Sequence, residues 1–223
     1  MKQIPLPPSG VLFDLDGTLL DSAPGLYAAL KTTCAEAGVA APPFAEVREM
    51  VSRGASAVLG TAWSDAAELE RHRARFLEAY ADVMADLSHP FDGVEPLLAA
   101  LEAQGTPWGV VTNKAGFLAR PLLDKLGWLS RAAAVVAGDT LPQSKPDPAP
   151  VLHACALAGI EPALGLFVGD DPRDVQAGHG AGMTTVAVSW GYLAGSDPAD
   201  WGADVLLHEP RELADLLGLD VAA

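Results

Sequence analysis

Two carboxylates, two residues apart, follow a short apolar run near the start of this sequence. Residues 11–20 read VLFDLDGTLL, with Asp14 and Asp16 directly behind hydrophobic residues. In an extended chain these two side chains would share a face, and like charges held so close are costly unless a cation lies between them or one is protonated. Hard oxygen ligands select Mg²⁺ more readily than Zn²⁺. The pair therefore favours a magnesium site, although a solvated Asp pair in a turn fits the same pattern.

Polar residues also follow three later apolar runs. Residues 108–113, WGVVTN, end in Thr112 and Asn113, whose side chains can bond phosphate oxygens. Lys145 lies in SKPDP, where a proline fixes the backbone and a compact ammonium can bind phosphate, although such a lysine is often solvated. Residues 169–174, GDDPRD, add carboxylates that suit a further metal ligand, although Asp is also a favoured N-cap at a strand-to-helix junction.

The elements that would position these residues alternate between strand and helix. Apolar runs predict buried strands, and segments with helical spacing lie between them. Alternation of this kind predicts an α/β fold with a Rossmann-like, doubly wound parallel sheet, whose strand ends gather along one crevice. The expected strands cover residues 11–13, 108–111, 133–137, 164–168, 184–188 and 204–207, and the expected helices cover 94–103, 117–126, 148–157 and 174–181.

One long segment, residues 22–90, breaks the alternation. It has no convincing strand and at least three helical patterns, and its clearest apolar stripe consists of Phe76, Leu77, Tyr80, Val83, Met84 and Leu87. Such a stripe indicates helix packing. We therefore expect an all-helical cap domain over 22–90, inserted after the first strand into a core domain of residues 1–21 and 91–223. Turn-forming residues at 20–24 and 88–93 indicate the hinges.

In order and spacing, these four motifs resemble the haloacid dehalogenase superfamily, specifically its phosphatase branch with a helical cap after the first strand. DLDGTL, VVTN, SKPDP and GDDPRD together span nearly the whole chain. The resemblance implies that Asp14 is a nucleophile forming an aspartyl-phosphate and that Asp16 is the general acid and base. The dehalogenase members lack an acid at the Asp16 position, which argues against dehalogenation.

The resemblance also implies a ligand set. Mg²⁺ would be held by the side chains of Asp14 and Asp170 and by the backbone carbonyl of Asp16. Asp174 would contact these ligands without binding the metal. Thr112 and Lys145 would bind the phosphoryl group.

Within the phosphatases, several stretches are similar to phosphoglycolate phosphatases, among them VLFDLDGTLLDSAP and SKPDPAPVLHAC. Others, such as VSRGASAVLG and VSWGYL, are more similar to N-acetylmuramic acid 6-phosphate phosphatases. Both substrates are phosphomonoesters with a carboxylate, so we expect a basic group on the cap. Arg53 is the candidate, with Gly54 permitting close backbone approach, although a solvated arginine fits equally.

Two other functions use the same fold. A sugar phosphomutase would share Asp14, Asp16 and Lys145, and cap residues alone do not separate it from a phosphatase. A non-catalytic binding protein would be expected to have lost a catalytic carboxylate, and none is lost here.

The composition limits which classes of binding partner we expect. The 223 residues carry a net charge of -15, which argues against nucleic acid and requires concentrated positive charge around an anionic substrate. Cys34 and Cys155 have no metal-ligand spacing and predict buried thiols in a reducing compartment. No signal peptide or membrane span is recognised, so we expect a cytoplasmic protein with a small-molecule phosphomonoester substrate, as a monomer or homodimer.

Overall fold

A six-stranded parallel sheet forms the centre of the molecule in this computed structural model, which describes residues 4–220. The strand order is β5-β4-β1-β6-β7-β8, so the chain adds strands first on one side of β1 and then on the other. This order confirms the predicted doubly wound sheet. The strands are β1 (Val11–Phe13), β4 (Trp108–Val111), β5 (Ala134–Val136), β6 (Leu166–Gly169), β7 (Thr184–Val188) and β8 (Val205–Leu207).

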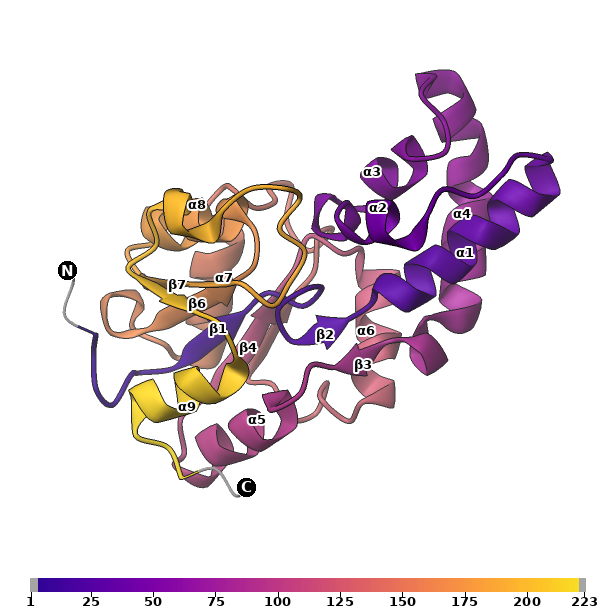
Figure 1. Ribbon diagram of the computed structural model, residues 1–223. Coiled ribbons are helices and arrows are strands. Elements are labelled where there is room, and N and C mark those ends of the chain that lie inside the picture. The colour runs from indigo at the N-terminus through magenta and orange to yellow at the C-terminus, as the bar shows by residue number, and fades with distance from the viewer. Residues whose placement is uncertain (1–3, 221–223) are drawn as a thin grey trace.

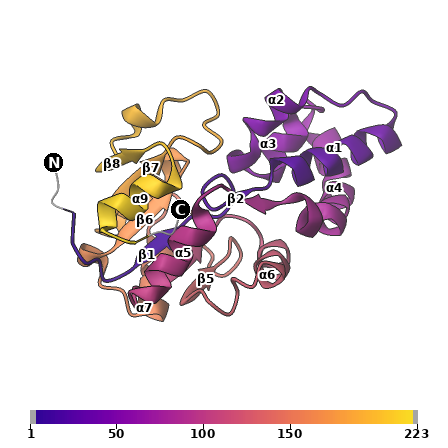
Figure 2. The ribbon, with the colours of Figure 1, turned by 60° about the horizontal axis from the view of Figure 1, so that its bottom comes forward.

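Helices cover both faces of the sheet because alternate strand residues point to opposite sides. Val11 and Phe13 of β1 belong to the core under α5 (Val94–Ala103) and α9 (Pro210–Leu217), whereas Leu12 packs with α7 (Ala149–Ala158) and α8 (Pro172–Gly180). Figure 1 shows these helix pairs on opposite sides of the strands, and Figure 2 shows α5 and α9 side by side. The chain also forms α6 (Gly116–Lys125), η2 (Pro162–Leu164) and η3 (Pro198–Trp201).

The expected helices match the structure to within two residues at each end. The expected strands also match to within two residues. The largest difference is that the strand expected over 164–168 begins at Leu166, because Leu164 ends the η2 turn that Pro162 starts. A short apolar run does not show at which residue a turn ends and a strand begins, since both contain the same residue types. Cys34 and Cys155 are buried free thiols, as expected.

The long segment without sheet pairing forms a helical unit beside the sheet (Figure 1). The predicted stripe lies on α4, with Phe76, Tyr80 and Met84 fully buried, and α4 packs along α1. Asp65 caps α4 by accepting the backbone N–H groups of Ala67 and Glu68. The elements of this unit are α1 (Ala23–Ala37), α2 (Phe44–Arg48), η1 (Val51–Arg53), α3 (Ala55–Gly60) and α4 (Ala66–Leu87).

A two-stranded antiparallel ribbon lies where the chain enters and leaves the helical unit. β2 (Leu20–Asp21) pairs with β3 (His89–Pro90), so that Leu20 faces Pro90 and Asp21 faces His89. The expectation that 22–90 holds no strand is therefore wrong at its last two residues, since two residues are too few to show an alternating pattern. Both predicted hinge segments contain a strand of this ribbon, and the proposed domain boundaries at 21/22 and 90/91 lie at its two ends.

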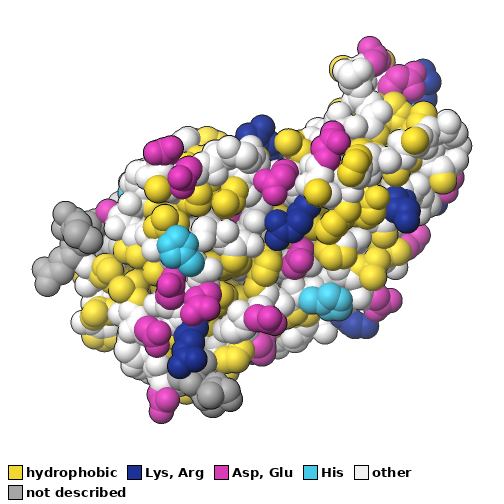
Figure 3. Space-filling model, viewed as in Figure 1, with side chains coloured by type: hydrophobic (Ala, Val, Ile, Leu, Met, Phe, Trp, Pro, Cys, Tyr) yellow, Lys and Arg dark blue, Asp and Glu magenta, His cyan; other side chains and the backbone are white. Residues whose placement is uncertain are grey.

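The surface reflects the negative net charge. On the face shown in Figure 3, acidic side chains are scattered over the sheet domain and the helical unit, and basic side chains stand singly among them. Within residues 4–220, no helix has the length and hydropathy needed to cross a lipid bilayer.

Candidate active site

A cavity of about 290 Å³ lies between the sheet and the helical unit. Its floor is made by residues that follow β1 and β4 and by Lys145, as expected for a crevice at the carboxyl ends of parallel strands. Its roof is made by η1, α3 and α4. Of the predicted site residues, the lining includes Asp14, Asp16, Arg53, Gly54, Thr112, Asn113, Lys145 and Asp174, and Asp170 is buried behind it.

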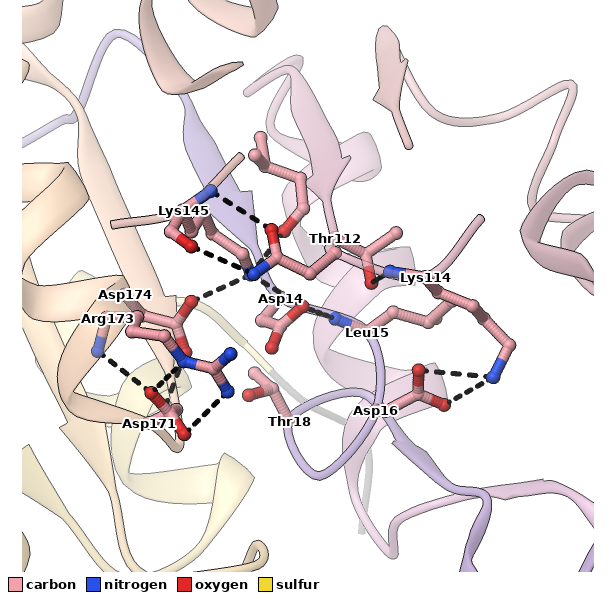
Figure 4. Close-up of polar contacts among 12 residues, drawn as sticks. Asp14, Leu15, Asp16, Thr18, Thr112, Lys114, Lys145, Asp171, Arg173 and Asp174 are labelled. Carbon is pink, nitrogen blue, oxygen red and sulfur yellow. Dashed lines mark hydrogen bonds and ion pairs between the residues drawn. The ribbon is translucent and has the colours of Figure 1, made fainter. Parts of the chain in front are cut away.

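Lys145 ties two carboxylates to the sheet. Its ammonium lies 2.8 Å from Asp14 Oδ1 and 2.7 Å from Asp174 Oδ1, and it donates to the backbone carbonyl of Val111 at 2.8 Å (Figure 4). Burial alone would lower the pKa of Lys145, but the charges of Asp14 and Asp174 outweigh it and hold the pKa above its ordinary value. Lys145 is therefore a permanent positive charge next to Asp14.

Three buried carboxylates lie close enough together to share one ion. Oxygens of Asp14, Asp170 and Asp174 all lie within 4.8 Å of one another. Among these four groups, Lys145 supplies one positive charge against three carboxylates, which leaves an excess negative charge in a region with little water. A divalent cation bound by carboxylate oxygens would offset that excess. The donor set thus fits a divalent cation, and Mg²⁺ with Asp14 and Asp170 as ligands stays a prediction.

The pKa values of these carboxyls reflect the same excess charge. Burial raises the pKa of Asp14, and burial together with the charges of Asp14 and Asp174 raises that of Asp170 well above its usual range. Burial raises the pKa of Asp174 to about 7, even though Lys145 opposes the shift. Without a cation, the cluster is more stable when it takes up protons.

This shift makes a prediction for the metal-free protein. A carboxyl whose pKa is raised on folding stabilises the fold below its unfolded pKa, and this stabilisation is lost as pH rises through the folded pKa. In chelator, Asp174→Asn should therefore gain stability relative to wild type between pH 5 and 8, on the order of 2 kcal/mol. Urea unfolding of both proteins at each pH measures this difference, and a pH-independent difference would show that Asp174 keeps an ordinary pKa.

Glycine at position 17 lets the first loop approach Asp170. Gly17 has a φ of 89°, which side-chain-bearing residues rarely adopt. A Cβ atom there would also collide with the Asp170 carboxylate. Thr18, the next residue, donates its hydroxyl to Asp170 Oδ1 at 3.0 Å. The DGT part of the first motif thus brings the loop after β1 against the carboxylate that follows β6.

Asp16 turns away from this cluster. Both of its carboxylate oxygens accept hydrogen bonds from the ammonium of Lys114, at 2.9 and 3.1 Å (Figure 4). The idea of one cation between the Asp14 and Asp16 carboxylates therefore does not describe this arrangement, because each carboxylate has its own lysine. Only the backbone carbonyl of Asp16, the ligand that the family resemblance implies, faces the Asp170 side: Ser52 Oγ lies 3.4 Å from that carbonyl and 2.8 Å from Asp170 Oδ2.

The side chains of Thr112 and Asn113 have different hydrogen-bond partners. Thr112 Oγ1 accepts the backbone N–H of Lys114 at 3.1 Å, which leaves its own O–H free to donate into the cavity. The Asn113 amide instead bonds the backbone of Lys145 at both ends, at 3.0 Å each. Asn113 therefore holds the Lys145 loop in place, and its contact with phosphate oxygens stays a prediction.

The helical unit contributes arginines to the cavity. Arg53 is exposed and lines it together with Gly54, which has a φ of 86°. Arg73 of α4 also lines it and donates to Ser56 Oγ at 2.5 Å. Within residues 4–220, neither of these guanidiniums forms an ion pair. Arg173 from the sheet side, in contrast, is held by Asp171 at 2.7 and 2.9 Å and also donates to the Ser52 carbonyl.

Lys114, Arg73, Ser52 and Tyr192 were not identified as site residues from the sequence. Tyr192 lies in the VSWGYL stretch after β7; its hydroxyl accepts the backbone N–H groups of Ser22 and Ala23 and donates to Asp21 at 2.6 Å. Its own backbone N–H donates to Asp170 Oδ2 at 2.8 Å. Tyr192 thus connects the start of α1 with the carboxylate cluster. The only sequence signal was the similarity of this stretch to known phosphatases.

Comparisons with known proteins identify the family of this chain. Residues 11–188 match the family model described as haloacid dehalogenase-like hydrolase, and the chain belongs to this family. It is 46% identical to the N-acetylmuramic acid 6-phosphate phosphatase of Pseudomonas aeruginosa, over 97% of both chains. It is 45% identical to the phosphoglycolate phosphatase of Xylella fastidiosa, over 93% of this chain and 92% of that protein.

A solved structure agrees with these sequence matches. The predicted phosphoglycolate phosphatase of Haemophilus somnus superposes with a TM-score of 0.84 at 27% identity, covering 97% of this chain and 99% of that one. The protein is thus a phosphatase of the haloacid dehalogenase-like hydrolase family.

Proposed function

We propose that this enzyme is a Mg²⁺-dependent phosphomonoester hydrolase that acts through an aspartyl-phosphate on Asp14, with a small carboxylated ester of the phosphoglycolate type as substrate. One observation carries the proposal: Asp14 lies at the cavity floor, in contact with Lys145 and within the cluster of three buried carboxylates. A carboxylate nucleophile beside an anionic phosphate requires positive charge, which Lys145 and a cation held by the three carboxylates would supply.

The residues divide the work as follows. Asp14 attacks phosphorus while Lys145 and the Thr112 hydroxyl hold the phosphoryl oxygens. Asp14, Asp170 and the Asp16 carbonyl would hold Mg²⁺, which when bound would supply positive charge to offset the repulsion between the Asp14 carboxylate and the phosphate. Asp16 gives a proton to the departing alkoxide and later takes one from the water that attacks the aspartyl-phosphate.

Two similarities support different substrates within this class. Relatives of comparable identity are named for phosphoglycolate and for N-acetylmuramic acid 6-phosphate. The second candidate is favoured by Phe117, which lines the cavity yet is 58% exposed. A two-carbon acid held at Asp14 and Arg53 leaves such a ring uncovered, whereas the apolar face of a sugar could cover it.

The proposal is tested by a phosphate-release screen across small phosphomonoesters with and without Mg²⁺. Comparing kcat/KM for 2-phosphoglycolate and N-acetylmuramic acid 6-phosphate separates the two substrates. Steady hydrolysis without a bisphosphate activator would exclude the phosphomutase alternative, and absence of hydrolysis for every ester would support the non-catalytic one.

Selectivity should depend on the cap, because the groups at the strand ends contact only the phosphoryl group. If Arg53 pairs with the substrate carboxylate, Arg53→Ala should cost about 2 to 4 kcal/mol in transition-state binding for carboxylated esters. Hydrolysis of p-nitrophenyl phosphate should hardly change. The measurement is kcat/KM for all three esters, with Arg71→Ala as the control, since Arg71 is 67% exposed and pairs with Glu68. Equal loss on every ester would assign Arg53 to closure of the cap.

A further inference from the structure

Lys114 links the cap to the carboxylate of Asp16. Its side chain comes from the loop after β4 and is only 7% exposed, although it carries a charge. Besides the two bonds to Asp16, its ammonium donates to the hydroxyl of Tyr80 at 2.8 Å and lies 4.6 Å from the centre of that ring. These three contacts direct the ammonium at Asp16 and Tyr80.

The orientation of Asp16 therefore depends on where the ammonium is held. The backbone of Lys114 is fixed from the sheet side, because its N–H donates to Thr112 Oγ1 and its carbonyl accepts the N–H of Gly138 at 2.8 Å. Within residues 4–220, the far end of its long, flexible side chain is fixed only by Asp16 and Tyr80. When the backbone of a lysine is fixed, the direction of its side chain is set by the partners of its ammonium.

That partner belongs to the cap. Tyr80 lies on α4 and is fully buried, and its ring packs so closely against α1 that a Cβ atom at Gly25 would lie 3.2 Å from it. The Tyr80 hydroxyl thus moves with α1 and α4 as one packed pair. It reaches Lys114 in the arrangement seen here, with α1 and α4 beside the sheet domain (Figure 1).

We propose that Lys114 is a positioning residue through which the cap, by way of the Tyr80 hydroxyl, sets the orientation of the Asp16 carboxylate. Asp16 is then held for proton transfer only while the cap covers the cavity. The inference rests on the proposed function, in which Asp16 is the general acid and base. It adds that the cap controls the chemical step as well as substrate choice.

The test uses esters that differ in their need for a proton. An alkoxide leaving group must be protonated, whereas p-nitrophenolate leaves as the anion. In single-turnover experiments, Lys114→Met should slow the first step about 100-fold for 2-phosphoglycolate or another alkyl ester that the enzyme hydrolyses, and much less for p-nitrophenyl phosphate. Tyr80→Phe, which removes only the hydroxyl, should give the same pattern with a loss of about tenfold.

A double-mutant cycle tests whether Lys114 acts through Asp16. In an Asp16→Asn background, Lys114→Met should cause no further loss for the alkyl ester, because the group that it positions is already gone. Matched controls are Lys125→Met, whose ammonium is exposed beside Asp86, and Tyr27→Phe on α1, outside the cavity lining. Both controls should retain wild-type rates.

The outcomes separate cleanly. Equal loss on both esters, or losses that multiply in the double variant, would overturn the inference and make Lys114 a phosphate-binding residue. If Lys114→Met does not fold, the Tyr80→Phe comparison decides alone, and a wild-type rate on the alkyl ester would overturn the inference. A wild-type protein that hydrolysed neither ester would instead overturn the proposed function, and the inference with it.

Discussion

Asp14→Asn is expected to lower phosphate release by at least about 10⁴-fold and to leave the fold intact. An amide is a very poor nucleophile and a weaker ligand for a hard cation than a carboxylate is. The fold should survive because burial raises the pKa of Asp14, so its charge opposes folding. The amide oxygen can still accept the Leu15 N–H, and Lys145 keeps Asp174 as a partner.

The measurement is phosphate release with excess Mg²⁺ on a protein whose substitution is verified by mass spectrometry, since deamidation would restore the carboxylate. Thermal unfolding monitors the fold. Asp215→Asn, an exposed position on α9, is the matched control and should retain full activity. Substantial release by the Asp14→Asn variant would rule out an aspartyl-phosphate.

Removal of divalent cations should abolish activity, and Mg²⁺ should restore it. Without a cation, Asp14 lies among buried carboxylates with one ammonium between them, and a phosphate dianion would add to the excess negative charge. Binding should also be visible without any substrate: Mg²⁺ in large excess over its Kd should raise the unfolding free energy by about 2.7 kcal/mol at 100 times Kd.

Asp170→Asn provides the control for this experiment. Asp170 is fully buried, lies within the cluster and is absent from the cavity lining, so its loss should weaken the response of Tm to Mg²⁺ without removing the nucleophile. Full activity in chelator would contradict the metal assignment. An unchanged Tm response in Asp170→Asn would place the cation elsewhere.

The sequence predicted the residues that follow strands because their placement is a local property. Asp14, Thr112 and Asp170 each come directly after an apolar run, and the topology of a parallel sheet gathers such positions at one edge. No long-range information was needed to expect them together. The same reasoning located the helices on both sides of the sheet.

Interactions between distant segments could not be predicted in this way. Tyr80 was part of an apolar stripe, and its ring is indeed core, but its hydroxyl contacts a lysine 34 positions away. The two bonds from the Asn113 amide to the Lys145 backbone were not predicted, because the pattern shows residue types and not the partners of an amide. The pairing of Asp16 with Lys114 likewise depends on side-chain directions that spacing does not determine.

The β2–β3 ribbon makes the helical segment an insertion whose two ends lie side by side. Because Leu20 pairs with Pro90, the two points at which the chain leaves and re-enters the sheet domain are adjacent in space. An insertion whose ends meet imposes almost no closure strain on its host, whatever its length. Lineages of such enzymes could therefore exchange or remodel the whole lid while β1, β4 and β6 stay untouched, and a grafted lid would need only a matching ribbon and a hydroxyl placed to reach Lys114.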